Sequence, residues 1–123
     1  MSDFAYHNVN PDRAETEDCV CRAISLATNL SYHSVKKLLE IIAFFYGCDT
    51  LCVCCYHHLL EDIFRYPVKY CDFDETVGDI ATKHRYNTCI IRIDGHLTAS
   101  VMGVVFDIWD CTDKPVDCYW IVA

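Results

Sequence analysis

The chain has 123 residues, a mean hydropathy of +0.12 and a formal net charge of −8. A chain of this length can bury one hydrophobic core without metals or disulfides, and with four glycines and three prolines it has no linker-like stretch. We therefore expect a single domain over residues 1–123. The negative charge argues against a phosphate-binding surface, so nucleic acid is not an expected partner.

The N-terminal sequence and the longest apolar run bear on localisation. The first residues lack the basic and apolar regions of a signal peptide, and the apolar run of residues 41–46 is too short to cross a bilayer. We therefore expect a cytoplasmic protein that has no membrane partner. Its ten cysteines are then expected to be reduced thiols, because disulfides are rare in the cytosol. A disulfide framework in a secreted domain is the alternative.

The first part of the chain has the periodicity of a helix. Residues 1–17 are polar and expected to be irregular. Residues 19–28 then place apolar side chains at spacings of three, four and seven, which predicts a helix with one buried face. Asp18 is the expected N-cap, because its carboxylate can accept hydrogen bonds from N–H groups of the first turn.

Two longer helical segments follow. One is expected to be capped by Ser31 or Ser34 and to end at Gly47, a residue type that favours helix C-termini. The other is predicted over residues 52–65, where Pro67 prevents any continuation.

The pattern changes from helix to strand after residue 84. Residues 76–79 (TVGD) resemble a capping box and predict a short helix that ends near residue 84. Beyond it, β-branched and apolar runs predict strands that form an antiparallel sheet, with the helices segregated to one side in an α+β domain. The predicted strands cover residues 88–93, 96–101, 104–110 and 117–122.

Cys19 falls on the first turn of the first predicted helix. Unpaired N–H groups and the dipole at a helix N-terminus favour a thiolate, which is the form of cysteine that attacks a carbonyl. Cys19 is therefore a candidate nucleophile. Its ordinary alternative is a small buried hydrophobe, and Cys21 competes for the same role from further inside the helix.

A thiol nucleophile needs a base, and the base needs a group to orient it. If Met102 and Gly103 form a two-residue turn, His96 and Asp107 lie as diagonal neighbours on one sheet face. A three-residue turn would reverse the faces and favour Asp110. The ordinary alternative is that both side chains are merely solvated.

Four short motifs resemble a group of small papain-like cysteine peptidase domains, often encoded by phages and bacteria. They are residues 18–24 (DCVCRAI), 76–79 (TVGD), 95–99 (GHLTA) and 105–110 (VFDIWD), and the resemblance extends to a Tyr-Trp pair at residues 119–120. It implies a papain-like fold, with N-terminal helices packed on a C-terminal antiparallel sheet. It also implies that Cys19 is the nucleophile, His96 the base and Asp107 the orienting acid.

The chain departs from the papain-like pattern in one respect, because it contains no glutamine to stabilise an oxyanion. The oxyanion would instead need the backbone N–H of Cys19 and a further donor. Secondary candidates around the site are Asn10, Thr16 and Asp18, and Trp109 is expected to form a wall of the cleft.

Residues 48–58 contain enough cysteine and histidine for a zinc site. Cys52, Cys54, Cys55 and His58 are the candidate ligands, with further ligands possible from more distant cysteines. The more ordinary expectation is that these cysteines lie in the core while the histidines face solvent.

Together these patterns favour a thiol hydrolase that forms an acyl-enzyme on a protein or peptide substrate without a cofactor. Peptidase, isopeptidase and amidase activity, and acyl transfer, use the same groups and stay open. Two alternatives remain: a catalytically inactive papain-like interaction module, such as a phage protein that binds a host protein, and a small zinc-binding regulator.

Overall fold

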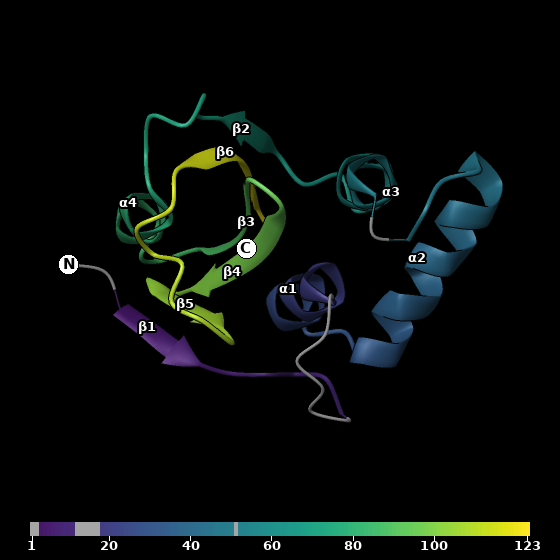
Figure 1. The fold of residues 1–123 in the computed structure, drawn as a ribbon, viewed down its shortest axis with the longest axis horizontal. Coiled ribbons are helices and arrows are strands. Elements are labelled where there is room, and N and C mark those ends of the chain that lie inside the picture. The colour runs from purple at the N-terminus through teal and green to yellow at the C-terminus, as the bar shows by residue number, and fades with distance from the viewer. Residues whose placement is uncertain (1–2, 12–17, 51) are drawn as a thin grey trace.

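The computed structural model describes residues 3–11, 18–50 and 52–123. Over these residues it has four α-helices, one π-helical segment and six strands, which confirms the α+β class (Figure 1). In chain order the elements are β1 (Asp3–Tyr6), α1 (Cys19–Thr28), α2 (Tyr32–Tyr46), α3 (Val53–His57), η1 (His58–Ile63), β2 (Val68–Tyr70), α4 (Val77–Lys83), β3 (Thr88–Ile93), β4 (His96–Val101), β5 (Val104–Asp107) and β6 (Val116–Ile121).

The strands form one open sheet in the order β1-β5-β4-β3-β6-β2. The expectation of a purely antiparallel sheet was wrong, because β1 pairs with β5 in parallel. Residues 1–17 were expected to be irregular, yet residues 3–6 form this edge strand. Beyond β1, the backbone N–H of His7 donates to the Asp107 carbonyl at 2.9 Å. The N-terminal segment is therefore attached to the strand that carries Asp107.

The β4–β5 hairpin has the predicted two-residue turn. Val101 pairs with Val104 and Ala99 with Phe106, so the predicted register is confirmed. Met102 and Gly103 both have positive φ, at 51° and 84°, as a type I′ turn requires. The strand predicted over residues 104–110 ends earlier, at Asp107, where the carboxylate accepts the N–H of Ile108 at 2.7 Å.

Capping residues explain where most helices begin and end. The Ser31 side chain, not that of Ser34, caps α2 by accepting the N–H of Ser34 at 3.1 Å, and the helix ends at Gly47 as predicted. The capping box at α4 is confirmed, with Thr76 and Asp79 accepting each other's backbone N–H groups at 3.1 and 2.9 Å.

The single helix predicted over residues 52–65 is instead α3 followed by η1. The backbone N–H of Phe64 donates to the carbonyl of Leu59 at 2.9 Å, five residues earlier, as in a π-turn. Leu59 and Leu60 are both fully buried within this segment. Before Pro67 the chain leaves the helix and enters the short strand β2, which the sequence pattern did not predict.

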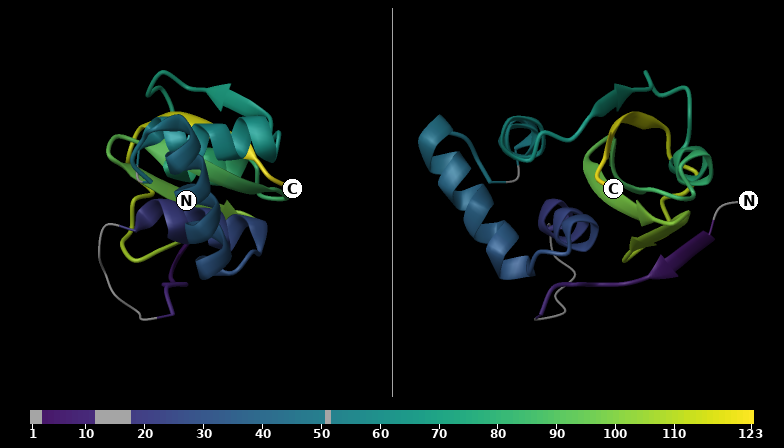
Figure 2. Two further views of the ribbon diagram at one scale, coloured as in Figure 1. Left: turned by 90° about the vertical axis from the view of Figure 1, so that its right-hand side faces the viewer. Right: turned by 180° about the vertical axis from the view of Figure 1, so that it is seen from behind.

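The helices cover both faces of the sheet. Helices α1 to α3 and one face of the sheet share a core that includes Ile90 and Trp120, and α1 lies between α2 and the sheet (Figures 1 and 2). Helix α4 packs on the opposite face with Ile91, which alternates with Ile90 along β3. The expected segregation of all helices to one side was therefore wrong, because alternating apolar residues make both faces hydrophobic.

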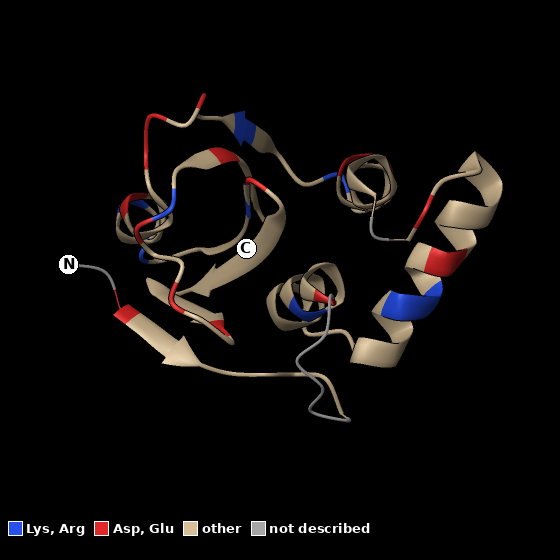
Figure 3. Ribbon diagram, in the orientation of Figure 1, with Lys and Arg blue, Asp and Glu red and all other residues tan. Residues whose placement is uncertain are grey.

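Charged residues are distributed over many elements. Lysines and arginines occur on α1, α2, β2, α4 and β3, and acidic residues are frequent in the loops (Figure 3). Within the described residues, none of the helices has the length and apolarity that a bilayer crossing requires.

Candidate active site

Cys19 is the first residue of α1, and Asp18 is its N-cap by position. The Asp18 carboxylate makes no capping hydrogen bond, contrary to expectation. It accepts instead from the Asn10 amide at 2.8 Å and the Tyr32 hydroxyl at 2.9 Å, and it pairs with Arg22. Donors of three residues therefore occupy the carboxylate, and Asp18 does not bond the N–H groups of the first turn.

His96 and Asp107 meet across the hairpin. The Nε2 atom of His96 lies 2.7 Å from Oδ2 of Asp107, and the two side chains are only 11% and 4% exposed. The two-residue turn creates this contact, because it places both residues on the same face of neighbouring strands. The histidine ring is therefore held by one nitrogen, which leaves Nδ1 for a second partner.

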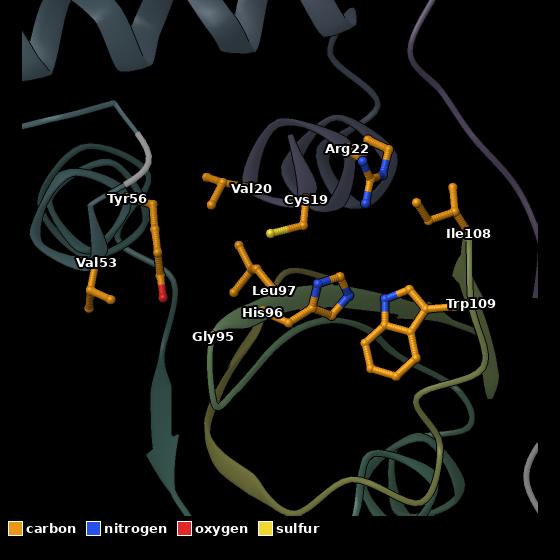
Figure 4. Close-up of a pocket in the computed structure, with 10 residues that line it drawn as sticks. All are labelled: Cys19, Val20, Arg22, Val53, Tyr56, Gly95, His96, Leu97, Ile108 and Trp109. Atoms are coloured by element: carbon orange, nitrogen blue, oxygen red, sulfur yellow. The ribbon is translucent and has the colours of Figure 1, made fainter. Parts of the chain in front are cut away.

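The Cys19 thiol is that second partner. Helix α1 packs against β4, and the Cys19 side chain points toward His96 and Leu97 (Figure 4). Burial by itself raises the pKa of Cys19. A hydrogen bond with the His96 side chain, another at the Leu97 backbone and the positive charge of His96 outweigh burial, so the pKa of Cys19 lies below its ordinary value.

His96 and Asp107 are also shifted toward their charged forms. Burial opposes the charge on each, but their mutual hydrogen bond and attraction are stronger and raise the pKa of His96 while lowering that of Asp107. By contrast, burial raises the pKa of Cys21 to about 11, since no histidine compensates for it. Of the two cysteines near the start of α1, Cys19 is the one whose pKa is shifted toward the thiolate.

Cys19 and His96 open onto a cleft of about 440 Å³. Val53 and Tyr56 of α3 form one side, and Trp109 forms the other, with its ring centroid 5.0 Å from that of His96 (Figure 4). Trp109 therefore lies where a cleft wall was expected, although it follows the end of β5. The remaining lining residues are Val20, Arg22, Gly95, Leu97 and Ile108.

Two further residues contact Asp107 and were not anticipated from the sequence. Arg22 has a guanidinium nitrogen 3.8 Å from Oδ1 of Asp107, and the Cys111 thiol lies 3.8 Å from Oδ2. Arg22 lies three residues after Cys19 on α1, which was a usable signal that it faces the same site. Cys111 had no such signal, because a loop outside the hairpin brings it there.

Asn10 and Asp18, two of the secondary candidates around the site, do not lie at the cleft. Asp18 is buried beside Arg22, and the Asn10 side chain is engaged with Asp18, so neither lines the cleft. Thr16 lies outside the described residues. The first N–H groups of an α-helix have no partner within the helix, so those at the start of α1 are suited to an oxyanion.

Among the described residues, one group of side chains brings three potential metal-ligand atoms together. His96, Asp107 and Cys111 present atoms within 4.8 Å of one another, although the first two are already hydrogen-bonded. Of the candidate zinc ligands, Cys52 and Cys54 have their sulfur atoms 3.0 Å apart, but the cysteines of residues 48–55 do not form such a group. The His58 ring is separate from them: it contacts Asp62 at 2.7 Å and stacks on Tyr46.

Comparisons of the chain with protein-family models, with curated proteins and with solved structures find no match.

Proposed function

We propose that this protein is a papain-like thiol hydrolase that cleaves amide or isopeptide bonds through an acyl-enzyme. The observation that supports this proposal best is the hydrogen-bonded series of Cys19, His96 and Asp107 at the edge of a cleft. Each residue has the partner that its role requires, and the pKa shifts of Cys19 and His96 favour a thiolate beside an imidazolium.

In the proposed mechanism the Cys19 thiolate attacks the substrate carbonyl carbon, and the carbonyl oxygen becomes an oxyanion. N–H groups at the start of α1 stabilise that charge. As the C–N bond breaks, the His96 imidazolium gives its proton to the leaving amine, which leaves a thioester on Cys19. Neutral His96 then takes a proton from water, hydroxide adds to the thioester, and the carboxylic acid leaves as the thiolate and imidazolium form again.

Asp107 acts through His96 and is a positioning residue. Its carboxylate holds Nε2 at 2.7 Å, so that Nδ1 faces the sulfur and the ring keeps its orientation throughout the cycle. Asp107 is itself fixed by the Ile108 N–H at 2.7 Å and by the Arg22 guanidinium. The base is therefore supported by groups from α1 and from the residues after β5.

The cleft is suited to a polypeptide. Its walls combine apolar side chains, Val53 and Leu97, with the ring of Trp109, which is 39% exposed, and the phenol of Tyr56. Such walls accept an extended chain with apolar side chains near the scissile bond. A metal held by His96, Asp107 and Cys111 fits the cleft less well, because Asp107 and Cys111 do not line it.

Site-resolved alkylation tests this proposal. Brief iodoacetamide treatment of the native protein over a pH series, followed by peptide mass spectrometry, measures the rate at each cysteine. We expect Cys19 to react fastest below pH 7 and to lose this advantage in His96→Ala. His84→Ala is the matched control, because His84 contacts Tyr119 on another part of the sheet.

Substrate turnover supplies the second test. On a panel of peptide and isopeptide substrates, Cys19→Ser and Cys19→Ala should be inactive, whereas Cys21→Ala should retain turnover. If Cys19 reacts no faster than the other cysteines at any pH, the hydrolase proposal is wrong, and an inactive interaction module becomes the better account.

A further inference from the structure

Two cysteine side chains meet where α3 begins, on the side of the cleft opposite Trp109. Cys52 is the N-cap of α3 and Cys54 is the second residue of the helix, and their sulfur atoms lie 3.0 Å apart. Val53, the residue between them, lines the cleft (Figure 4). Neither cysteine belongs to the proposed catalytic series, so the contact between the two thiols calls for a separate explanation.

Backbone hydrogen bonds fix the chain on both sides of this cysteine pair. The N–H of Cys52 donates to the Asp49 carbonyl at 3.0 Å, and the carbonyl of Cys52 accepts the N–H of Cys55 at 3.1 Å. Cys52 itself has an extended backbone, with φ of −70° and ψ of 142°, and the helix follows directly. The backbone at the start of α3 therefore keeps the thiols of Cys52 and Cys54 in contact.

Burial in the core does not account for the pair. Cys55, the next residue, is fully buried, and its thiol donates to the Leu39 carbonyl of α2 at 3.4 Å. That environment suits a cysteine that serves as a small apolar residue. Cys54 is exposed and Cys52 is half-buried. The thiols of the pair are therefore accessible to a small reagent dissolved in water.

The contact makes the two thiols chemically unequal. A hydrogen bond from the Cys54 thiol lowers the pKa of Cys52, and the same hydrogen bond raises the pKa of Cys54 to about 12. The thiolate is the form of cysteine that reacts with a peroxide, so Cys52 is expected to react first. Oxidation of Cys52 removes its negative charge and with it the main cause of the high pKa of Cys54.

We propose that Cys52 and Cys54 form a reversible redox site, which hydrogen peroxide oxidises to a disulfide and a dithiol reduces again. The Cys52 thiolate attacks one peroxide oxygen, the O–O bond breaks, and hydroxide leaves to give a sulfenic acid. The Cys54 thiolate then attacks the Cys52 sulfur, the S–S bond forms, and the second oxygen leaves as hydroxide. The two protons that the thiols release convert both hydroxides to water.

The geometry of the reduced pair favours this bond. The sulfur atoms of a disulfide are about 2.05 Å apart, so those of Cys52 and Cys54 have to approach by about 1 Å. Because the two thiols are already in contact, bond formation does not require the chain to bring them together. An exposed disulfide is also the kind that thiols reduce readily, which makes the site reversible.

Oxidation of the pair would change one wall of the cleft. The disulfide closes a short ring across Val53, which is 41% exposed and lines the cleft, and Tyr56 lines it from the next turn. The orientation of the wall opposite Trp109 would then depend on whether the pair is oxidised. This consequence rests on the proposed hydrolase function, whereas disulfide formation itself does not.

Peptide mass spectrometry after oxidation tests the site. The reduced full chain is treated with excess hydrogen peroxide, the remaining thiols are alkylated after denaturation, and the tryptic peptide of residues 38–65 is fragmented. We expect this peptide to lack two hydrogens, with no cleavage between Cys52 and Cys54 and with Cys48 and Cys55 alkylated. Treatment with dithiothreitol before alkylation should restore alkylation at all four cysteines.

Variants identify the two partners of the bond. Cys52→Ser and Cys54→Ser should each lose the disulfide, and in Cys54→Ser the oxidised Cys52 should stop at the sulfenic acid, which dimedone traps. Cys48→Ser is the matched control, because Cys48 is half-buried like Cys52 and lies outside the pair. This variant should form the disulfide as the unsubstituted chain does.

Two results with the unsubstituted chain would overturn the proposal, whether or not any variant folds. One is alkylation of both Cys52 and Cys54 after prolonged exposure to peroxide. The other is a disulfide that joins either of them to Cys48 or Cys55. Alkylation of Cys19 in the reduced chain keeps the two proposals apart, because a reactive Cys19 without the disulfide retains the hydrolase function and loses only the redox site.

Discussion

Cys19 and His96 are both shifted toward their charged forms although burial opposes charge on each. The reason is that each charged form has a partner: the thiolate accepts from the ring, and the imidazolium donates to Asp107 at 2.7 Å. Removing any one of the three groups therefore changes the pKa values of the other two.

Asp107→Asn tests that dependence. An amide carries no negative charge, so the pKa of His96 should fall toward its ordinary value, and less of Cys19 should be thiolate at neutral pH. We expect slower Cys19 alkylation near pH 7 and turnover lower by up to about 10⁴-fold, the loss that the same substitution causes in a Ser-His-Asp triad. Titration of the His96 ring by NMR measures the first effect. Asp110→Asn, which changes an exposed carboxylate, is the control.

The pair of Asp107 and His96 also makes the free energy of unfolding depend on pH. Asp107 has a folded pKa below its ordinary value of 3.8, so its contribution is present above that pH and is lost as pH falls through the lowered value. His96 has a folded pKa raised from 6.5 to about 11, so its contribution is full below pH 6.5 and is lost as pH rises toward 11.

The free energy of unfolding of the wild-type chain should therefore exceed that of Asp107→Asn most strongly between about pH 4 and 6.5. Urea denaturation at a series of pH values measures this difference. A difference that stays constant from pH 2 to pH 10 would contradict the shifts of both groups.

At the scale of elements, the β4–β5 hairpin decides which residues face Cys19. Its turn places Met102 at a φ of 51°, a conformation that a residue with a long side chain adopts at a cost of about 1 kcal/mol. Gly103 follows at 84°, and a Cβ there would lie 3.2 Å from the Cβ of Arg85. Met102 is therefore an unfavourable residue type at its turn position, whereas the next position needs a glycine.

Two substitutions at the turn should have opposite effects. Met102→Asn creates the Asn-Gly pair that a type I′ turn prefers and should stabilise the fold by about 0.5–1 kcal/mol. Gly103→Ala should destabilise the fold by about 1 kcal/mol or more, because an alanine is strained at a φ of 84° and its Cβ would crowd Arg85. Chemical denaturation gives both values. A stabilising effect of Gly103→Ala would mean that the turn has a different conformation in solution.

Helix α4 and the α3–η1 segment illustrate two ways in which elements are determined. The capping box at α4 involves residues three apart, so it forms wherever those residues occur at a helix start. The π-helical turn after α3 goes with the burial of two adjacent leucines, Leu59 and Leu60, against α2 and the sheet. Local sequence favours the first, whereas the second requires the neighbouring elements.

Across the whole molecule, Arg22 connects parts of the chain that are distant in sequence. The guanidinium is buried, pairs with Asp18 at the start of α1 and lies 3.8 Å from Asp107 at the end of β5. Asp18 in turn holds Asn10 and Tyr32. The N-terminal segment, the first two helices and the sheet therefore meet at one buried group of charges.

Arg22→Met should destabilise the fold by about 3–5 kcal/mol, because it leaves the buried Asp18 carboxylate without its cation and removes a second positive charge from beside Asp107. Adding Asp18→Asn should recover part of that loss, since the amide needs no counter-charge. Lys37→Met, on the exposed face of α2, should cost no more than about 0.5 kcal/mol. Urea denaturation of the four proteins is the measurement. A loss for Arg22→Met as small as for Lys37→Met would show that the buried pair contributes little.

The amino-acid sequence by itself determined those features that depend on short-range contacts. The start of α1 at Cys19, the end of α2 at Gly47, the capping box of α4 and the two-residue turn were all predictable. Each depends on residues within a few positions of one another, so periodicity and capping preferences are enough. Because the turn sets the hairpin register, the contact between His96 and Asp107 was predictable as well.

Only the tertiary structure decided the features that depend on distant residues. The parallel strand β1, the use of both sheet faces and the engagement of the Asp18 carboxylate away from its helix all result from packing between segments far apart in the chain. Arg22 and Cys111 join Asp107 for the same reason. The spacing of Arg22 from Cys19 indicates only a shared helix face. The contacts that Arg22 and Cys111 make with Asp107 depend on which distant residues their side chains are buried against.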